Sequence, residues 1–585
     1  MCGIVGILSN QNCIDSLISG LEKLEYRGYD SSGIALNTTP IFKDVGKVKH
    51  LKKIINYDVT SNLGIGHTRW ATHGKPSKEN SHPHISYDQR FALVHNGVIE
   101  NYLSLKNTYL KDINFYSQTD TEVIVNLLSY LAEEYDVLTC LKKLNSLLIG
   151  SYALCIIDIK NKDTIYFMKK QTPLTIGFNE KNKVISSDSL AFNDDINQQI
   201  LLDDGDYGYL NASEIVIYDK LNQKVNRKII AVEKEKKFFI NNNFQYHMEK
   251  EIHDQVFLID ELINHYVYKN QIQINQNILN SINESDKIYI IACGSSFYSG
   301  NIGKYYFEHF KQIPVDVILA SEAIYDFPLL SKKPFFIFVS QSGETLDVLN
   351  FLKQVKEKNI PTLGITNSPN STITHLCDDI LYLYAGREIS VASTKAFLGQ
   401  CIIFLLLSYE QENIKQDLLS LKEEIKNILS HKNLIENFAN SIKNYKDIFY
   451  LGRNLDYYIS LEGALKLKEI SYIHAEAFAS GELKHGSLAL LDEGTAVIGL
   501  NTQDSTSLIM RTNIMECNAR GAKSFVISKK SLSKEKDHFI INDLPNYLIP
   551  LSELVVVQLL AFYTAKAKGN EVDMPRNLAK SVTVE

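Results

Sequence analysis

The sequence predicts a strand-rich α+β domain in the first third of the chain, followed by two α/β domains that each contain a parallel sheet. Three observations lead to this prediction. Short apolar and β-branched runs alternate with turns up to about residue 218, whereas patterns of strand, small-residue turn and helix begin near residue 285. The second pattern occurs on both sides of a long helical stretch at 396–445, which indicates an internal duplication. At 585 residues, the chain is also too long for a single core.

The strands expected in the first third are apolar runs bounded by turn residues. They lie at 63–67, 90–95, 152–158, 164–168, 183–187 and 214–218. Helices are expected near 13–24 and 121–134. We expect an exposed connection over 225–243, because its run of charges and its three consecutive asparagines cannot build a core. A new helical region is expected from Tyr246 onwards.

The second half is expected to contain two series of buried strands, each leading into a helix. The first series is expected at 287–296, 334–345 and 362–367, and the second at 447–453, 495–500 and 523–528. Ligands of parallel sheets bind outside the carboxyl ends of the strands. Polar residues that follow these strands are therefore candidate binding residues.

The composition is that of an ordinary soluble protein, with 45% apolar and 22% charged residues. The 61 basic and 68 acidic residues give a net charge of −7, so the basic footprint of a nucleic-acid-binding protein is missing. No apolar run is expected to reach the length of a membrane span, and the N-terminus lacks the pattern of a signal peptide. We therefore expect a cytoplasmic protein without membrane or nucleic-acid partners. The eight scattered cysteines are expected to be reduced.

The second residue, Cys2, is a candidate nucleophile. If Met1 is removed, Cys2 becomes the first residue, and its thiolate then lies beside its own α-amine. Such an amine titrates near neutrality, at roughly pH 8, and can accept a proton at cellular pH. A cysteine can also stand at this position by chance, so the assignment depends on the rest of the sequence.

Other segments offer the groups that acyl transfer from an amino-acid amide needs. Arg69, where a predicted strand runs into a polar turn, can hold a carboxylate with two hydrogen bonds. Asp120 can hold an α-ammonium group, although its segment would also serve as an ordinary helix N-terminus. The Asn96 side chain and the Gly97 N–H can form an oxyanion hole.

Five histidines, at 67, 73, 82, 84 and 95, occur in the same stretch. Their spacing lacks the cysteine or carboxylate partners of a standard zinc motif. We therefore prefer hydrogen-bonding and structural roles and expect no metal.

Residues 2 to about 218 resemble the N-terminal-nucleophile (class II) glutamine amidotransferase family. The resemblance rests on six ordered segments, at 2–6, 24–33, 67–74, 82–84, 95–97 and 119–122. It implies an αββα sandwich in which Cys2 is the nucleophile and Asn96 and Gly97 are the oxyanion donors. It also implies that Trp70 gates the passage of ammonia. The glutamine-binding residues that it implies are Arg69, Thr72, His73 and Asp120.

The segment 340–345, Ser-Gln-Ser-Gly-Glu-Thr, lies at the end of a predicted buried strand and the start of a helix. Hydroxyl and N–H groups at a helix N-terminus suit a phosphate, although a simple Ser/Thr cap has the same composition. No lysine follows in the P-loop pattern, which argues against a nucleoside triphosphate. Ser296 follows Gly294 in a similar position.

Residues 285–585 resemble a pair of sugar isomerase domains, and the whole chain resembles the glucosamine-6-phosphate synthase family. Segments 386–396, 461–472, 481–486 and 575–585 carry this resemblance. It implies that Lys580 forms a Schiff base, that Glu469 is the isomerising base, and that His485 opens the sugar ring from the neighbouring subunit of a homodimer. Ser393 is placed near the sugar. The phosphate-binding residues that it implies are Ser296, Ser340, Gln341, Ser342 and Thr345.

Without this resemblance, two of these assignments have ordinary explanations. Segment 461–472 has helical periodicity, and its Glu and Lys residues at 462, 466, 468 and 469 would form a solvated charged face. The same periodicity places Lys468 on the apolar face. The apolar setting, and a second charged cluster at 476, 482, 484 and 485, argue against a merely solvated face. Lys580 would be an exposed charge in a weakly structured tail. Ser487 departs from the family pattern, in which a proline usually follows His-Gly.

The resemblance implies a glutamine-dependent enzyme that converts fructose 6-phosphate into glucosamine 6-phosphate, the first step of UDP-N-acetylglucosamine synthesis, without a metal or organic cofactor. The expected domains are a glutaminase (2–224), a linker (225–245), two sugar isomerase domains (246–425 and 426–570) and a tail closing the sugar site (571–585). A phosphoribosylamine-forming amidotransferase is the weaker alternative, because the acidic phosphoribosyl loop is not found in the sequence. A sugar-phosphate sensor is also weaker, because it would have no use for Cys2.

Overall fold

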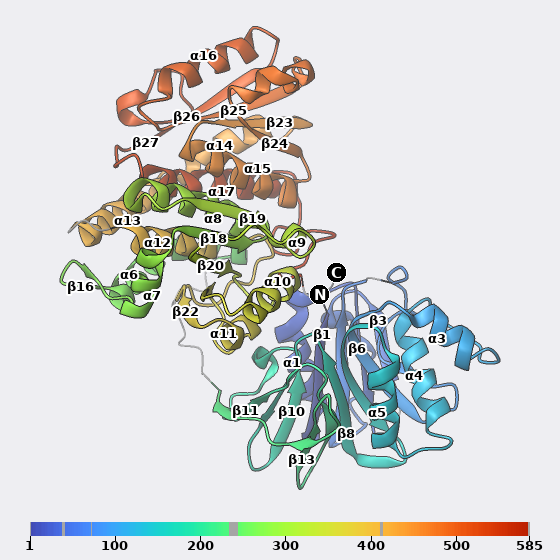
Figure 1. The fold of residues 1–585 in the computed structure, drawn as a ribbon. Helices are drawn as coiled ribbons and strands as arrows, with labels where there is room; N and C mark the ends of the chain where they lie inside the picture. Colours follow the sequence, from blue (N-terminus) through green and yellow to red (C-terminus); the bar gives the residue numbers. More distant parts are fainter. Residues whose placement is uncertain (1, 38–40, 72, 233–243, 410–412, 583–585) are drawn as a thin grey trace. The chain divides into compact units, whose positions relative to one another are not determined.

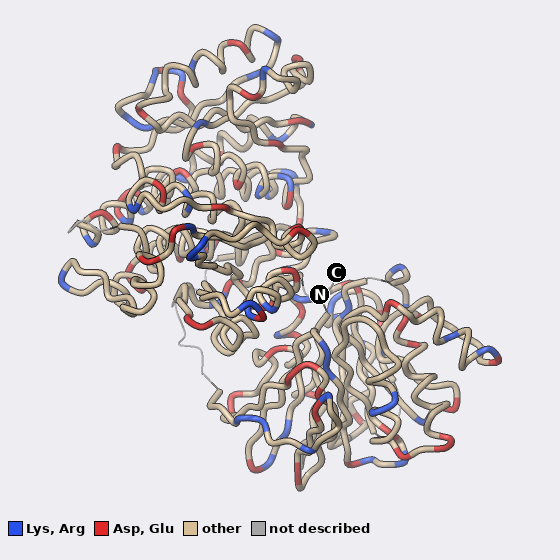
Figure 2. The backbone as a smooth tube through the Cα atoms, viewed as in Figure 1, with Lys and Arg blue, Asp and Glu red and all other residues tan. Residues whose placement is uncertain are grey.

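The computed structural model describes residues 2–37, 41–71, 73–232, 244–409 and 413–582. The chain divides into two compact units, one formed by residues 1–235 with 579–585 and the other by residues 236–578. Each unit consists of sheets flanked by helices (Figure 1). Charged residues of both signs are interspersed along each unit (Figure 2).

The described part of the first unit contains two antiparallel sheets of eight and seven strands. The strand order of the first sheet is β15 (Ile229–Ala231), β11 (Gln198–Leu201), β9 (Thr175–Phe178), β10 (Asn182–Ser186), β1 (Gly3–Ser9), β4 (Leu63–Arg69), β2 (Ser31–Leu36) and β3 (Ile41–Val45). The strand order of the second sheet is β14 (Lys224–Val225), β13 (Ile215–Tyr218), β12 (Tyr207–Asn211), β8 (Asn161–Lys170), β7 (Gly150–Asp158), β6 (Phe91–Ile99) and β5 (His84–Ile85).

Helices cover the outer face of each sheet, and an apolar layer fills the space between the sheets. The first sheet packs against α1 (Ile14–Leu24) and α2 (Val48–Ile54). The second packs against α3 (Tyr102–Tyr109), α4 (Asp120–Leu131) and α5 (Val137–Leu147). The αββα sandwich is therefore confirmed, and so are the six predicted strands and both predicted helices.

The expected connection at 225–243 is only partly described. Its segment Ile229–Ala231 forms β15, which pairs with β11 at the edge of the first sheet. Residues 233–243, which hold the charged and asparagine runs, lie outside the described residues. The next helix, α6 (His247–Tyr266), begins where a new helical region was predicted.

The second unit contains two five-stranded parallel sheets with the same strand order. One sheet is β19 (Val315–Leu319), β18 (Lys287–Ala292), β20 (Pro334–Val339), β21 (Thr362–Thr366) and β22 (Asp379–Tyr382). The other is β24 (His474–Ala479), β23 (Asp447–Gly452), β25 (Thr495–Asn501), β26 (Lys523–Lys529) and β27 (Phe539–Ile541). The matching order confirms the predicted duplication. A short hairpin joins β16 (Val267–Tyr268) to β17 (Gln271–Ile272).

One apolar core joins the two parallel sheets of the second unit. It contains residues of α6, α7 (Gln276–Glu284), α8 (Gly294–Tyr306), α12 (Lys395–Ser408), α13 (Ile414–Ser430), α14 (Lys432–Ile442), α15 (Leu455–Ser471) and α17 (Ile549–Ala567). Smaller clusters seat α9 (Ala320–Ala323), α10 (Leu346–Glu357) and α11 (Thr372–Leu376) on the first sheet, and α16 (Ser507–Asn518) on the second. The predicted helical stretch at 396–445 comprises α12, α13 and α14.

Helix α17 contradicts one expectation from the sequence. It is long and apolar enough to cross a membrane, with a mean hydropathy of 1.3 over its most apolar window, so the expectation that no run reaches that length was wrong. However, 94% of this window is buried within the second unit, where the helix lies between the two sheets (Figure 1). Burial in a core on all sides explains the apolar composition of α17.

Candidate active sites

Cys2 lies directly before β1, a strand that pairs with both β4 and β10. The cysteine is half-buried, and the Trp70 N–H donates a hydrogen bond to Cys2 Sγ over 3.1 Å. Burial raises the pKa of the Cys2 thiol, and the Trp70 N–H and the Arg69 guanidinium oppose this effect only in part. The thiol is therefore protonated at neutral pH and needs a base before it can act as a nucleophile.

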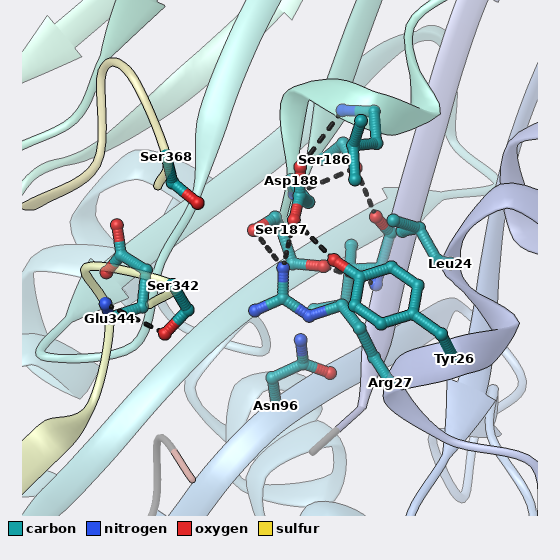
Figure 3. Close-up of polar contacts among 12 residues, drawn as sticks. Leu24, Tyr26, Arg27, Asn96, Ser186, Ser187, Asp188, Ser342, Glu344 and Ser368 are labelled. Carbon is teal, nitrogen blue, oxygen red and sulfur yellow. Dashed lines mark hydrogen bonds and ion pairs between the residues drawn. The ribbon is translucent and has the colours of Figure 1, made fainter. Parts of the chain in front are cut away.

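Hydrogen bonds to Ile4 hold the beginning of β1 in place. The Ile4 N–H donates to Ser187 Oγ over 3.0 Å, and the Ile4 carbonyl accepts from Ser186 Oγ over 2.8 Å. Arg27 is buried and holds this segment in turn: its Nη1 donates to the Ser187 carbonyl over 3.1 Å and pairs with Asp188 Oδ2 at 2.8 Å (Figure 3). The candidate nucleophile, two residues before Ile4, is thus attached to a rigid strand end.

The predicted oxyanion donors lie beside Cys2. Asn96 on β6 is buried, and its Nδ2 donates to the Cys2 carbonyl over 2.9 Å. Gly97 has a φ of +121°, and a Cβ at this position would lie 2.1 Å from the carbonyl oxygen of Ser151. Only glycine fits this position without strain. The structure therefore brings Cys2 and Asn96 together, and Gly97 follows Asn96 on the same strand.

Arg69, a predicted glutamine-binding residue, is buried and has one unused donor. Its Nη2 donates to the carbonyls of His73 and Gly74, whereas its Nη1 is buried and has no partner among the described residues. A substrate carboxylate would satisfy such a donor. Thr72, which was predicted to act with Arg69, lies outside the described residues.

Asp120 is the first residue of α4, and the preceding Thr119 caps that helix by accepting from the Glu122 N–H. The ordinary helix-terminus interpretation of this segment is therefore right. Asp120 is nevertheless buried, and its Oδ2 accepts from the Ile99 N–H on β6 over 2.8 Å. The carboxylate is thus fixed at the strand that carries the candidate oxyanion donors. Nδ1 of His73, also predicted to bind glutamine, is buried without a partner among the described residues.

Four other histidines of the first unit, at 67, 82, 84 and 95, are buried close to one another. The rings of His67 and His82 stack with centroids 4.1 Å apart, and His84 lies edge-on to His82 at 4.9 Å. His95 Nδ1 is 3.0 Å from Thr121 Oγ1. Burial lowers the pKa of all four rings. Among the described residues, no group of three or more His, Cys, Asp or Glu side chains is arranged to hold a metal ion.

The loop 340–345 lies at the carboxyl edge of the first parallel sheet, between β20 and α10. Ser340 Oγ is 2.8 Å from Thr345 Oγ1 and accepts from the Gly343 N–H over 3.0 Å. Ser342 Oγ accepts from the Glu344 N–H over 3.2 Å (Figure 3). Gly343 has a φ of +68°, which glycine adopts without strain. Several of the predicted phosphate-binding hydroxyls therefore share one turn.

The remaining sugar-site candidates are held at the starts of helices. Gln341 is half-buried in the same turn. Ser296, in the first turn of α8, accepts from Gln400 of α12 over 2.9 Å. Ser393 donates to Glu388 over 3.1 Å, and the other carboxylate oxygen of Glu388 accepts two N–H groups at the start of α12.

The ordinary interpretation of α15 as a solvated charged face is wrong for Glu462 and Lys466, whereas Lys468 is exposed as that interpretation requires. Glu462 and Lys466 are fully buried, with exposed fractions of 0% and 1%. Lys466 Nζ lies 2.7 Å from Glu469 Oε2 and 3.5 Å from Glu462 Oε1. Ser295 of α8 donates to Glu462 over 3.1 Å, and burial raises the pKa of Glu462 to about 7. Lys468, which periodicity placed on the apolar face, is exposed.

Lys466 is therefore a functional candidate that the sequence interpretation missed. It is a buried cation in contact with Glu469, the predicted isomerising base. The signal was present in the sequence: Lys466 has acidic residues four positions before and three positions after it, in a segment with several small and apolar residues. Such spacing places all three side chains on one helix face.

His485 and Lys580 lie on irregular segments. His485 ends the 3₁₀ turn Glu482–His485, is exposed, and precedes Gly486, which has a φ of +152°. Lys580 is half-buried, two residues beyond the end of the second unit. The Arg576 N–H donates to the Tyr472 hydroxyl over 2.8 Å, and the Arg576 guanidinium lies 4.2 Å from the Tyr472 ring centroid. The chain leading to Lys580 is thus anchored at the end of α15.

Comparisons with known proteins agree with this division of the chain. The SIS domain family matches residues 281–408 and 441–566, and the glutamine amidotransferase domain family matches residues 67–194. A glutamine–fructose-6-phosphate aminotransferase [isomerizing] of Listeria innocua is 43% identical over 601 residues, which cover 100% of both chains. A protein of the same name from Staphylococcus aureus is 43% identical with the same coverage.

Among solved structures, the C-terminal domain of glucosamine-fructose-6-phosphate aminotransferase from Francisella tularensis is similar to this chain. The TM-score is 0.54 and the sequence identity is 31%, over 58% of this chain and 100% of that chain.

Gly97→Ala is expected to lower the glutamine hydrolysis implied by the family resemblance by roughly 100-fold, because the added Cβ displaces a candidate oxyanion donor. Gly150→Ala is the matched control, since Gly150 also has a positive φ and its Cβ would lie 2.2 Å from the Val98 carbonyl. Steady-state hydrolysis per folded molecule and thermal unfolding would be measured for both variants. Equal losses of hydrolysis in the two variants would show that strain in the strands, and not the position of Gly97 beside Cys2, causes the defect.

Proposed function

Because the chain belongs to the glutamine–fructose-6-phosphate aminotransferase (isomerizing) family, we propose that it converts glutamine and fructose 6-phosphate into glutamate and glucosamine 6-phosphate. One combination carries this proposal: Cys2 beside the Asn96–Gly97 pair in the first unit, and the hydroxyl-lined strand end at 340–345 in the second. The first arrangement suits acyl transfer from an amide, and the second suits a phosphate. The product would be the starting amino sugar for UDP-N-acetylglucosamine.

In the glutaminase reaction, Cys2 Sγ attacks the amide carbon of glutamine after Met1 has been removed. The α-amine of Cys2 takes the thiol proton and returns it to the leaving nitrogen, so that ammonia departs and a thioester remains. Water then hydrolyses the thioester to glutamate. Asn96 Nδ2 and the Gly97 N–H stabilise the oxyanion of both steps. Glutamine is bound through its carboxylate by Arg69 and through its ammonium by Asp120, with Thr72 and His73 as further contacts.

The raised pKa of the Cys2 thiol supports the requirement for a base in this mechanism. The buried, unused Nη1 of Arg69 supports recognition of a carboxylate. The α-amine is the proposed base because it belongs to the nucleophile itself.

In the synthase reaction, the phosphate of fructose 6-phosphate is bound by Ser296, Ser340, Gln341, Ser342 and Thr345, with Ser393 near the sugar. His485 opens the sugar ring, Lys580 forms a Schiff base with the open-chain ketone, and Glu469 transfers the proton that turns ketose into aldose. Formation of the Schiff base releases water, and ammonia from the first site then adds to the imine carbon and displaces the Lys580 amine. This exchange precedes the proton transfer by Glu469, so the new nitrogen stays on the sugar and the lysine is regenerated. The ammonium of Lys466 balances the negative charge of the Glu469 carboxylate, since its Nζ lies 2.7 Å from Glu469 Oε2. No metal or organic cofactor takes part in the proposed scheme.

We also propose that the protein works in the cytoplasm as a homodimer in which His485 serves the site of the partner subunit. The exposure of His485 on a short 3₁₀ turn supports this role, because the side chain is available to another subunit. The proposed domains remain a glutaminase (2–224), a linker (225–245), two sugar isomerase domains (246–425 and 426–570) and a closing tail (571–585).

The central test is an assay of glucosamine 6-phosphate formation with each substrate omitted in turn. Cys2→Ala is expected to abolish use of glutamine, while isomerisation of fructose 6-phosphate persists, because the two reactions use separate groups. Lys580→Ala is expected to show the reverse, with synthesis lost and glutamine hydrolysis retained. Glutamine turnover at the parent rate by Cys2→Ala would refute the assignment of the nucleophile.

Assembly can be tested by mixing two inactive variants, His485→Ala and Lys580→Ala. If His485 serves the partner's site, each mixed dimer has one site with both residues intact. Random exchange of subunits should then restore up to about a quarter of the parent synthesis, because about half of the dimers are mixed and each has one complete site. A mixture that exchanges subunits but remains inactive would place His485 and Lys580 in the same subunit's site.

Trp70 is the single tryptophan of the chain and provides a built-in probe for the proposed ammonia gate. Its backbone N–H donates to Cys2 Sγ, and its ring lies edge-on to the Tyr29 ring, with centroids 5.7 Å apart. We expect fructose 6-phosphate and a glutamine analogue each to change tryptophan fluorescence. Trp70→Ala should release glutamate in excess over glucosamine 6-phosphate, because ammonia would escape to solvent. Unchanged emission together with equal product yields would leave Trp70 with a packing role only.

A further inference from the structure

The buried histidines of the first unit include one that contacts the candidate oxyanion donor directly. His67 lies on β4 in the first sheet, and Asn96 lies on β6 in the second sheet. His67 Nε2 is 2.9 Å from the His95 carbonyl oxygen and 3.0 Å from Asn96 Oδ1. His67 therefore forms a polar contact between the two sheets.

The partners of His67 determine its tautomer. Both groups near Nε2 are oxygen acceptors, so Nε2 carries the hydrogen and donates it. Nδ1 is buried and has no partner among the described residues, as expected for a bare ring nitrogen. Burial lowers the pKa of His67 to about 3, so the ring remains neutral at physiological pH.

This contact also determines which way the Asn96 amide points. Because Oδ1 accepts from His67, Nδ2 faces the opposite side and donates to the Cys2 carbonyl over 2.9 Å. A flipped amide would place its NH₂ group against the His67 N–H, where that NH₂ group would have no acceptor, and would leave the His67 N–H with only the His95 carbonyl as its partner. It would also turn an oxygen towards the position where negative charge develops.

Neighbouring rings hold His67 in this orientation. The His82 ring stacks on it, with centroids 4.1 Å apart and an interplanar angle of 18°. His82 Nδ1 accepts from the His95 N–H over 3.3 Å, and its Nε2 is 3.4 Å from Thr121 Oγ1 on α4. The His67 ring is therefore packed against the His82 ring, which itself makes polar contacts with β6 and α4.

We propose that His67 is a positioning residue of the glutaminase site, which fixes the Asn96 amide with its NH₂ group towards the reaction centre. This inference rests on the proposed role of Asn96 as an oxyanion donor. His67 does not touch the reacting atoms, and it acts only through the orientation of Asn96. It transfers no proton and carries no charge in either step.

The first test compares His67→Leu with His67→Gln. Leucine removes the donor, and kcat for glutamine hydrolysis should fall roughly 10- to 100-fold, below the 10²- to 10³-fold loss typical when an oxyanion donor is removed outright. KM for glutamine should change less than about threefold, because Arg69 and Asp120 are untouched. Glutamine places an amide N–H near the position of the imidazole Nε2–H and should restore most of kcat. If His67→Leu does not fold, His67→Asn serves instead, since its amide is too short to reach Asn96.

His84→Leu is the matched control from the same group of buried histidines. His84 is equally buried, but its Nε2 contacts Thr119 Oγ1 and not Asn96. Its loss should lower thermal stability about as much as His67→Leu while changing kcat per folded molecule less than about threefold. Equal losses of kcat in the two variants would show a general packing effect and would overturn the proposal.

A double-mutant cycle with Asn96→Ala separates this inference from the function on which it rests. If His67 acts through Asn96, His67→Leu should cause little further loss once Asn96→Ala is present. Additive losses would refute the positioning role. If Asn96→Ala alone left hydrolysis unchanged, the proposed oxyanion role of Asn96 would fail. If Asn96→Ala were defective and His67→Leu had the parent kcat, only the positioning role would fail.

Discussion

A single apolar core joins the two parallel sheets of the second unit, and charged groups inside it need partners. An unpaired ammonium or carboxylate in such a layer costs several kcal/mol. Lys466 therefore lies between Glu462 and Glu469, and Ser295 donates to Glu462 from the other repeat. These contacts hold α15 against α8. Helix α15 carries the proposed isomerising base, Glu469, and the first turn of α8 carries the proposed phosphate-binding residue Ser296. The two repeats consequently act as one scaffold, although each has its own sheet.

In both candidate sites, a glycine with a positive φ lets the backbone orient the reactive groups. In the first unit, the Asn96–Gly97 pair needs a backbone conformation in which Gly97 has a φ of +121°. In the second, the turn that gathers Ser340 and Thr345 contains Gly343 in a left-handed conformation. The second repeat differs at the corresponding strand end, after β25. There, Thr502 donates both its N–H and its hydroxyl to the carboxylate of Asp456 on α15. In the second repeat, these two donors are therefore already paired with a carboxylate of the protein.

Desolvation gives the glutaminase site its electrostatic character. Burial raises the pKa of the Cys2 thiol and lowers the pKa values of His67, His82, His84 and His95. The resting thiol and the four imidazole rings are therefore neutral. Fixed N–H donors in such surroundings stabilise negative charge that appears only during the reaction, because few water molecules compete with them.

The sequence by itself determined the fold class, the duplication and most of the candidate residues. Strand periodicity identified the elements, and ordered motifs identified Cys2, Asn96 and the loop 340–345, because such signals are local. The tertiary structure alone decided which polar side chains are buried. Periodicity placed Glu462 and Lys466 on a solvated face, but α15 is covered by α8 and α17, which come from distant parts of the chain. The same is true of His67, whose contact with Asn96 crosses between two sheets and leaves no local trace in the sequence.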